Sequence, residues 1–404
     1  MRRWSEAVSS RDWAGRSPSV APLKAQNMRR LLAALVAAVV VLVPGTAHAE
    51  DIRGEEWQMP MLHYTQAWGY ASGAGVTVAV LDSGVDATHP DLAGRVLAGI
   101  DLVDGTTDGR KDFVGHGTSV ADLIAGRKAG DGVVGLAYGA KILPVRVLDA
   151  NNRYEDAQTI ASGVRWAVDH GAEVINLSLG GASDSEPLAA ALKYAAAHNV
   201  VVVACAGNVA DHAGTGVWYP ARAPGVVAVA GLTSGERFWT GSVSGPQVAL
   251  SAPADGLVGA KPGGYWHVQG TSFAAPLVSA TAALIKSKWP SMSAANVVNR
   301  MIATADDLGP TGRDREYGYG IVDPARALSA TVTSVGGNPL ESTSPSSGGG
   351  AAAAAPSPAA TTPSAEAAPA NQHSTTLVLL AVAMLLATAT ILFLLIRRTR
   401  HHPY

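Results

Sequence analysis

Three polar residues in glycine-rich segments suggest a catalytic site. Asp82 follows an apolar run, His116 stands between two glycines, and Ser272 follows Gly270 by two positions. In this order along a chain, such residues can supply an acid that orients an imidazole, a base and a nucleophile. A serine hydroxyl needs an adjacent base to attack a carbonyl, and an imidazole titrates near neutral pH. The three residues therefore predict hydrolysis of an amide bond through a covalent intermediate.

Each of these motifs also has a purely structural explanation. An aspartate after a strand is commonly a cap or turn residue, and a Gly-His-Gly segment is commonly a loop. The occurrence of all three motifs in one chain, in catalytic order, favours the catalytic interpretation. Three other carboxylates, Asp86, Asp91 and Asp112, fit caps and turns better. Asp112 is expected to order the loop before His116.

The tetrahedral intermediate of such a reaction needs hydrogen-bond donors for its oxyanion. The backbone N–H of Ser272 is one candidate, and the side chain of Asn208 is the other. Ser272 opens a helical stretch that ends near Trp289, and Pro276 lies early in it, where a missing N–H costs little. A serine at a helix N-terminus faces free N–H groups that favour developing negative charge.

Short apolar runs rich in β-branched residues alternate with helical segments through the centre of the chain. Continuous apolarity is typical of strands that are covered on both faces of a parallel sheet. The predicted strands are 76–81, 142–148, 174–179, 200–204 and 226–230, and the predicted helices are 118–127, 157–170, 187–198 and 294–303. This alternation predicts an α/β fold with a doubly wound, mostly parallel sheet and helices on both faces. Asp82 follows the first strand, at the edge where such sheets bind ligands.

The N-terminal residues 1–49 predict an extension that ends in a secretory signal peptide. A basic start at Met28 precedes an apolar run, and small residues lead to a cleavage site after Ala49. Both Met1 and Met28 remain candidates for the start of the protein. The signal predicts that the central domain is exported.

The C-terminal residues predict a tether to the cell membrane. Residues 331–374 are rich in Pro, Ala, Ser and Gly, which is typical of a flexible linker. Residues 375–396 carry no charge and are long enough to cross a bilayer once as a helix. The tail, residues 397–404, begins with arginines, which predicts that it is cytoplasmic and that the catalytic domain is extracytoplasmic.

Charge and cysteine content narrow the remaining function classes. The formal net charge of −2 offers no electrostatic basis for binding nucleic acid. Cys205 is the single cysteine, so no intrachain disulfide forms, and it is expected to be a small buried residue. No cofactor or metal is expected, since no loop has the ligand spacing of an EF-hand. A structural calcium site made of backbone carbonyls stays open.

Residues 73–330 resemble the subtilisin-like serine peptidase family. The resemblance is carried by four segments, 78–84, 112–121, 174–181 and 270–276. It implies an endopeptidase that cleaves a peptide or protein substrate by acyl-enzyme catalysis. It also implies that Ser178, Leu179 and Gly180 lie along the bound peptide as an antiparallel partner, a pairing open to any extended chain.

Within that family the chain is most similar to the mycosins, which are membrane-anchored proteases associated with type VII secretion in actinobacteria. The similarity rests on the signal peptide, the lead-in that ends at Trp57, the Pro-rich linker, the membrane span and the segments 299–305 and 317–324. It implies partners among type VII secretion components. A general cell-surface protease and a mainly structural subunit of a secretion complex remain alternatives.

Three further expectations concern departures from the family pattern. Residues 50–72 are too short for a folded inhibitory prodomain and are expected to pack on the catalytic domain, as in mycosins. Asp122 stands where the family usually has glycine, so it either faces solvent or crowds the helix of His116. Trp218 resembles the residue at the floor of the primary specificity pocket, although a surface aromatic in a loop is an equal alternative.

Overall fold

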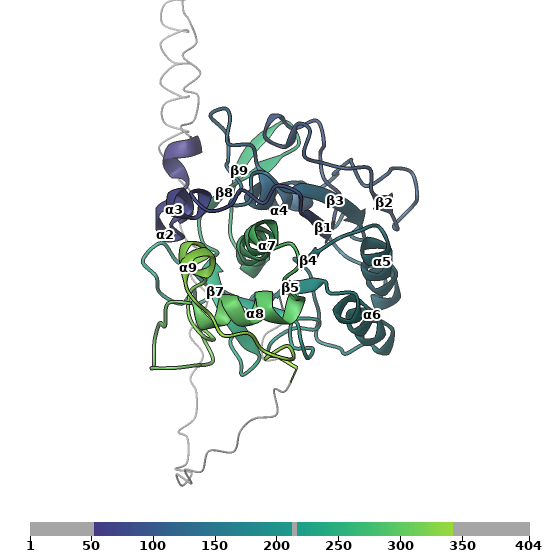
Figure 1. Ribbon diagram of the computed structural model, residues 1–404. Coiled ribbons are helices and arrows are strands. Elements are labelled where there is room, and N and C mark those ends of the chain that lie inside the picture. Colours follow the sequence, from purple (N-terminus) through teal and green to yellow (C-terminus); the bar gives the residue numbers. More distant parts are fainter. Residues whose placement is uncertain (1–51, 212–215, 342–404) are drawn as a thin grey trace, which may run out of the picture. The chain divides into compact units, whose positions relative to one another are not determined.

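A parallel sheet forms the centre of the protein (Figure 1). The computed structural model describes residues 52–211 and 216–341. In this part of the chain seven parallel strands have the order β2-β3-β1-β4-β5-β6-β7. They are β1 (Thr77–Asp82), β2 (Ile100–Asp101), β3 (Lys141–Arg146), β4 (Val174–Leu177), β5 (Val201–Cys205), β6 (Val227–Leu232) and β7 (Val248–Pro253). The chain reverses its direction of winding beside β1, so the carboxyl ends of β1 and β4 border the crevice where ligands bind in such sheets.

Helices cover both faces of the sheet (Figure 1). They are α2 (Gln58–Met61), α3 (Tyr64–Trp68), α4 (His116–Ala125), α5 (Ala157–Asp169), α6 (Glu186–Ala197), α7 (Thr271–Lys288), α8 (Ala294–Ala303) and α9 (Pro324–Ser329), with the short 3-10 helices η1 (Ile52–Glu55) and η2 (Pro90–Leu92). Side chains alternate between the two faces of a strand. In β1, Val78 and Val80 join the core that contains α4 and α7, whereas Ala79 and Leu81 join the core beneath α5 and α6. Both faces of the sheet are therefore buried, which confirms the predicted α/β fold class.

The predicted elements agree with the structure except at some ends. The five predicted strands form within two residues of their expected limits, and the helix 294–303 is α8 itself. The helix expected over 118–127 begins two residues earlier, at His116, because Gly115 adopts a φ of 98° and ends the preceding loop there. Two short or irregular strands, β2 and β7, were not predicted. An antiparallel hairpin of β8 (Leu257–Lys261) and β9 (Gly264–Val268) was also missed.

Residues 52–72 lie against the body of the protein. Ile52, Leu62 and Tyr64 are buried in the same core as α4 and α7. The indole of Trp68 donates a hydrogen bond to the carbonyl of Leu136 at 2.8 Å. This segment is called the N-terminal extension below.

Residues 331–341 also pack on the body, although the sequence assigns them to the linker. The side chains of α8 hold them, because Asn296 exchanges hydrogen bonds with Val335. Leu340 is buried, and its carbonyl accepts a hydrogen bond from the N–H of Gly225 at 3.1 Å. Asn338 also donates to the carbonyl of Gly225, at 2.8 Å. The body therefore extends eleven residues beyond the predicted boundary at 330.

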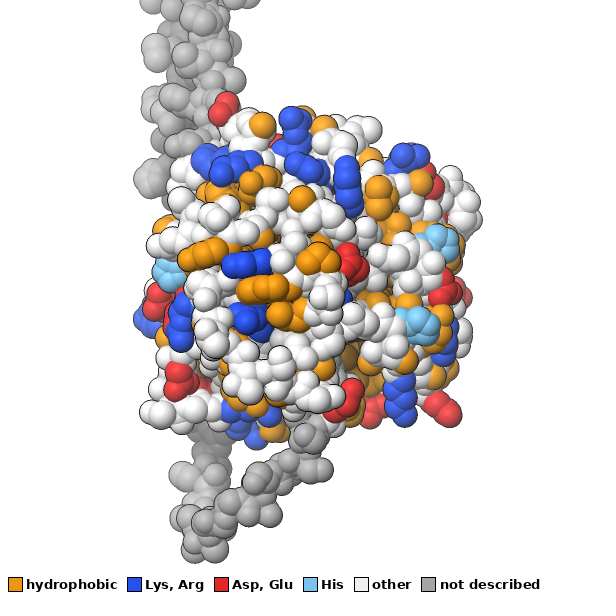
Figure 2. All heavy atoms as spheres, viewed as in Figure 1, with side chains coloured by type: hydrophobic (Ala, Val, Ile, Leu, Met, Phe, Trp, Pro, Cys, Tyr) orange, Lys and Arg blue, Asp and Glu red, His pale blue; other side chains and the backbone are white. Residues whose placement is uncertain are grey.

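The predicted signal peptide, the rest of the linker, the membrane span and the tail lie outside the described residues. Among the residues that the structure does describe, no helix has the length and apolarity needed to cross a membrane. The face in Figure 2 carries both basic and acidic side chains, as the small formal net charge of −2 requires.

Candidate active site

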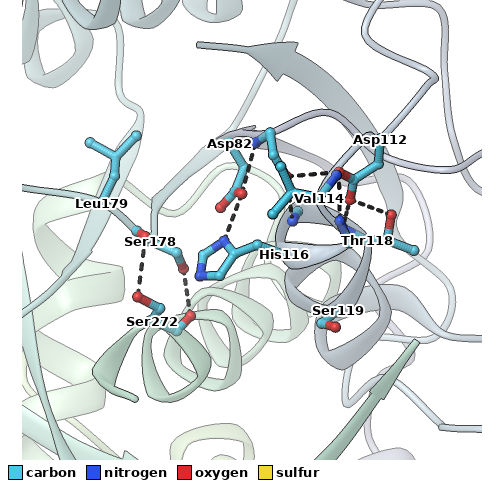
Figure 3. A network of polar contacts seen from close by, with 12 residues as sticks. Asp82, Asp112, Val114, His116, Thr118, Ser119, Ser178, Leu179 and Ser272 are labelled. Carbon is cyan, nitrogen blue, oxygen red and sulfur yellow. Dashed lines mark hydrogen bonds and ion pairs between the residues drawn. The ribbon is translucent and has the colours of Figure 1, made fainter. Parts of the chain in front are cut away.

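Asp82 and His116 form a buried pair at the carboxyl end of the sheet (Figure 3). Asp82 is the last residue of β1, and His116 is the first residue of α4. Oδ1 of Asp82 lies 2.7 Å from Nδ1 of His116. Burial of the ring opposes its positive charge. The attraction and hydrogen bond of Asp82 outweigh burial, so the pKa of His116 is raised above 6.5. The pair thus presents Nε2 of His116 as a base.

Asp112 holds the loop that carries His116. Its Oδ1 accepts hydrogen bonds from the hydroxyl of Ser83 and from the N–H groups of Val114 and Gly115. Its Oδ2 accepts from the N–H and the hydroxyl of Thr118, at 2.9 and 2.6 Å. The carboxylate therefore connects β1, the loop and the first turn of α4, as Figure 3 shows. This agrees with the expectation that Asp112 orders the loop before the histidine.

Ser83 was missed in the sequence analysis. Its hydroxyl donates to Asp112 at 2.9 Å and accepts from the N–H of Gly117 at 3.0 Å, so it joins the strand to the helix. The signal available in the sequence was its position, directly after Asp82 in a glycine-containing turn. A hydroxyl can donate and accept at once, which suits such a bridge.

Ser272 lies in the first turn of α7, at the other side of the histidine ring (Figure 3). Its hydroxyl donates to the carbonyl of Ser178 at 3.2 Å, and the hydroxyl of Ser178 donates to the carbonyl of Ser272 at 2.6 Å. The hydroxyl of Ser272 thus points to Ser178 in this structure. Catalytic hydrogen bonds are often long until substrate is bound.

Cys205 lies behind the serine and is buried, as expected. Its sulfur is 4.0 Å from the hydroxyl oxygen of Ser272. Burial raises the pKa of the Cys205 thiol to about 11, so the thiol is neutral.

The side chain of Asn208 lines the same cleft as His116 and Ser272. Its Oδ1 accepts hydrogen bonds from the N–H and the hydroxyl of Thr271, both at 3.0 Å. These bonds orient the amide so that Nδ2 is its donor. In this structure Nδ2 donates one of its two N–H groups to Oδ2 of Asp211 at 3.1 Å.

The segment Ser178, Leu179 and Gly180 forms one wall of the cleft, directly after β4. The next residue, Gly181, exchanges two backbone hydrogen bonds with Tyr219, each at 2.9 Å. This pairing holds the wall against the segment that carries Trp218. The whole cleft has a volume of about 780 Å³ and reaches from His116 to the loop 151–154.

Trp218 fills the space between two backbone segments of the cleft. It is 6% exposed, so it is not a surface aromatic. A Cβ atom on Gly207 would lie 2.4 Å from Cδ2 of Trp218, and one on Gly180 would lie 3.2 Å from its Cβ. Only glycine at position 207 allows the indole ring to approach this closely. The residue therefore lines the cleft beside Gly180 and Gly207.

Of the aspartates expected to form caps and turns, Asp91 differs from that expectation. Asp86 is a turn residue, because it accepts from both the N–H and the hydroxyl of Thr88. Asp91 instead makes long-range contacts, and its Oδ2 accepts from the N–H of Val133 and from the hydroxyl of Tyr265. Asp122 does not face solvent: it is fully buried, on the same helix as His116. Within residues 52–211 and 216–341, no group of three or more His, Cys, Asp or Glu side chains is arranged to hold a metal ion.

Comparisons with known proteins find similar sequences and a similar fold. Fervidolysin from Fervidobacterium pennivorans is 36% identical over 324 residues, which are 72% of this chain and 46% of its own length, so the chain spans about half of that relative. Subtilisin E from Bacillus subtilis (strain 168) is 37% identical over 266 residues, 65% of this chain and 67% of that protein. The structure of the MycP3 protease from the type VII (ESX-3) secretion system matches with a TM-score of 0.62 and 32% identity, over 71% of this chain and 90% of that one.

The family profile covers the elements that carry the site. The profile described as the Subtilase family matches residues 73–320, a span that begins just before β1 and contains Asp82, His116, Asn208 and Ser272. From this match, and from relatives that are 36% and 37% identical over the aligned residues, the chain belongs to the subtilase family.

Proposed function

We propose that this protein is a membrane-anchored, extracytoplasmic serine endopeptidase of the mycosin type, associated with type VII secretion. As a subtilase with subtilisin relatives, the protein is a serine endopeptidase. The observation that carries the catalytic part of the proposal is the Asp82–His116 pair, which shares one cleft with Ser272. The location rests on the sequence of residues 1–49 and 375–396, and the secretion role on the likeness to MycP3.

The reaction begins at Ser272. Its hydroxyl turns from the carbonyl of Ser178 to Nε2 of His116, which takes the proton as Oγ attacks the scissile carbonyl. Asp82 holds the proton on Nδ1 and stabilises the imidazolium that forms. His116 then gives its proton to the leaving amine. Water, activated by the same ring, hydrolyses the acyl-enzyme and restores Ser272.

The oxyanion of the tetrahedral intermediate is stabilised at the N-terminus of α7. The N–H of Ser272 lies in the first turn of that helix, where N–H groups have no intrahelical acceptor. Nδ2 of Asn208 supplies the second donor through the N–H that does not bind Asp211. The substrate backbone lies beside the wall 178–180 as an added strand.

Trp218 makes the primary pocket short. The indole fills the space next to Gly180 and Gly207, so a small side chain such as alanine fits before the scissile bond better than an aromatic one. Trp218→Gly should raise kcat/KM for a peptide with Phe at this position by about 10- to 100-fold relative to Ala, since hydrophobic pockets discriminate by size. A wild-type preference for Phe or Leu in a peptide library would contradict the short pocket.

Labelling with a fluorophosphonate probe tests the nucleophile. The full chain should react once, and Ser272→Ala should abolish the label. Ser287→Ala is the matched control, since that hydroxyl lies on the same helix but bonds the carbonyl of Ala74 at the surface. A wild-type protein that stays unlabelled would contradict the catalytic role.

A secretion assay separates the mycosin role from the two alternatives. If the protein is a mycosin-like protease, cells that carry Ser272→Ala should leave a type VII substrate uncut, and cells that lack the whole gene should also fail to secrete it. If it is a general surface protease, neither change should affect the cleavage or the secretion of a type VII substrate. Loss of secretion on deletion together with unchanged processing in Ser272→Ala would favour the structural subunit.

A further inference from the structure

The catalytic mechanism leaves several buried polar side chains unused. Glu56 and Gln58 of the N-terminal extension bind each other and the N–H of Val134, and neither side chain lines the cleft. Asn176 is different, because it is fully buried in β4, two residues before Ser178 of the cleft wall. A polar side chain inside a buried strand costs free energy unless hydrogen bonds satisfy its donor and acceptor groups.

The side chain of Asn176 lies on the face of the sheet that α7 covers. Its neighbours in the strand, Ile175 and Leu177, belong to the core beneath α5 and α6, and side chains alternate between the two faces of a strand. Val174, on the same face as Asn176, belongs to the core that contains α7. Asn176 therefore lies between the sheet and the helix whose first turn carries Ser272.

Three hydrogen bonds connect Asn176 to the backbone of the nucleophile. The hydroxyl of Ser279, on α7, donates to Oδ1 of Asn176 at 2.8 Å. Nδ2 of Asn176 donates to the hydroxyl oxygen of Ser178 at 2.9 Å. The hydroxyl of Ser178 donates to the carbonyl of Ser272 at 2.6 Å, a bond that Figure 3 shows. These three bonds are called the Asn176 network below.

All three bonds of the Asn176 network run in the same direction. Because the hydroxyl proton of Ser178 is used on the carbonyl of Ser272, the oxygen of that hydroxyl accepts from Asn176. The amide thus presents a donor to Ser178 and an acceptor to Ser279. An ionised aspartate has no donor and a leucine has neither group, so the amide of asparagine is what suits both neighbours.

The Asn176 network is shielded from solvent. Asn176 and Ser279 are 0% exposed, and Ser178 is 3% exposed. Hydrogen bonds in such surroundings are electrostatically stronger than in water, and a fully bonded network makes the groups that it joins rigid. The network therefore fixes the first turn of α7 relative to the cleft wall.

Two sets of bonds hold the backbone around Ser272. The residue before it, Thr271, donates to Oδ1 of Asn208 through both its N–H and its hydroxyl. Ser178 accepts from the hydroxyl of Ser272 through its carbonyl and donates to the carbonyl of Ser272 through its hydroxyl. Ser178 belongs to the wall 178–180, so a shift between this wall and α7 moves the nucleophile relative to a peptide bound there.

We propose that Asn176 and Ser279 are positioning residues for the catalytic serine, which they reach through the hydroxyl of Ser178. They keep the first turn of α7 in register with the wall 178–180, so that Oγ and the N–H of Ser272 meet the scissile carbonyl. Neither residue lines the cleft, so both affect turnover and leave substrate binding unchanged. This inference rests on the catalytic role of Ser272 in the proposed function.

Steady-state kinetics of the full chain with a chromogenic peptide amide tests the network. Asn176→Leu keeps the approximate size of the side chain and removes both of its bonds, whereas Ser279→Ala removes one of them. Each variant should lower kcat by about tenfold or more with KM unchanged, since a small displacement of a reacting group has an effect of that size. The rate of fluorophosphonate labelling should fall with kcat, because labelling also requires Oγ in its place.

Thr281→Val is the matched control on the same helix. Thr281 is fully buried like Ser279, but its hydroxyl donates to the carbonyl of Leu277 within α7. This variant should leave kcat and the labelling rate unchanged. Urea unfolding of all the variants shows whether a loss of turnover exceeds what a loss of stability explains. An equal fall of kcat in Thr281→Val would overturn the proposal, because any lost hydroxyl of α7 would then have the same effect.

A double-mutant cycle tests whether the two residues act through one network. Once Asn176→Leu has broken both bonds, adding Ser279→Ala should lower kcat no further. Losses that simply multiply would overturn the proposal, and so would wild-type turnover in both single variants. If Asn176→Leu does not fold, the comparison of Ser279→Ala with Thr281→Val decides the outcome.

Fluorophosphonate labelling of the wild-type protein separates this inference from the proposed function. A wild-type protein that stays unlabelled contradicts the catalytic role of Ser272, and the positioning role fails with it. A wild-type protein that is labelled no faster than Asn176→Leu and Ser279→Ala contradicts the positioning role alone.

Discussion

Two buried aspartates, one in the loop before α4 and one in its last turn, differ in their hydrogen bonding. At the N-terminal end, Asp112 accepts five hydrogen bonds, and both of its oxygens are used. At the C-terminal end, Asp122 accepts one bond, and its Oδ1 has no partner within the described part of the chain. Both side chains are almost completely buried, at 6% and 0% exposure. Burial is therefore nearly equal, and hydrogen bonding is what differs.

The difference shows what a buried carboxylate can be used for. An aspartate whose two oxygens both accept hydrogen bonds fixes the geometry around it, which suits the loop that carries His116. An aspartate with few donors is more stable with a proton, so its charge responds to pH. The same helix therefore has one end built for rigidity and one end that can change its charge.

The largest effect is expected from Asp82→Asn, which disrupts the Asp82–His116 pair at the N-terminal end of α4. An asparagine keeps the shape but donates to Nδ1, so the imidazole carries its proton on the wrong nitrogen. We expect kcat to fall by about 10⁴-fold with little change in folding. A chromogenic peptide assay and a thermal melt measure the two quantities. A loss smaller than about tenfold would mean that the Asp82–His116 bond is not part of catalysis.

Asp112→Ala tests whether the fully bonded carboxylate gives rigidity. It leaves several buried donors without an acceptor, so the free energy of unfolding should fall by about 3 kcal/mol or more. Asp108→Ala is the control from the same loop, where the carboxylate forms an exposed pair with Arg110 and contributes about 1 kcal/mol or less. Urea unfolding of both variants makes the comparison. Equal losses would contradict the role assigned to Asp112.

The pH dependence of kcat/KM tests whether Asp82 and Asp122, at opposite ends of α4, act independently. Neutral His116 is the base, so kcat/KM should fall about tenfold per unit as the pH drops below the pKa of the ring. That pKa lies above 6.5, because the Asp82 carboxylate outweighs burial. Asp82→Asn should therefore shift the acid limb to lower pH, whereas Asp122→Asn should leave it in place. Movement of the acid limb in Asp122→Asn would show that the two ends are not separate.

The smallest effect is expected at Asp211, an exposed carboxylate that binds the amide of Asn208. Asp211→Asn removes negative charge beside the developing oxyanion and should raise kcat by about threefold. The gain should disappear in an Asn208→Ala background, since Asp211 acts through that amide. Steady-state kinetics of the double-mutant cycle measures it. An equal gain without Asn208 would mean a general electrostatic effect.

Much of the sheet is predictable because its strands bury both faces. Runs such as 200–204 are uniformly apolar and need no tertiary information. The hairpin β8–β9 was missed because Gly264 and Trp266 are only partly buried and no alternation marks it. The early start of α4 depends on the left-handed φ of Gly115, which a glycine permits but does not demand.

The site residues also differ in whether a local sequence pattern could reveal them. Asp82, His116, Ser272 and Asn208 were found because each stands in a short local motif. The roles of Asp91 and Asp122 depend on partners far away in sequence, Tyr265 and Ala260, which no local pattern reveals. Every residue of α4 is buried, so helical periodicity could not show which side of it Asp122 occupies.

The anchoring of Asn338 and Leu340 to Gly225 has a mechanical consequence. Gly225 precedes β6 and so lies at the amino edge of the sheet, whereas Asp82 ends β1 at the carboxyl edge. A force applied at residue 341 would be carried first by these two bonds and then by the buried interior of β6. The catalytic residues at the carboxyl edge of the sheet lie away from this attachment point, so such a force would leave their alignment undisturbed.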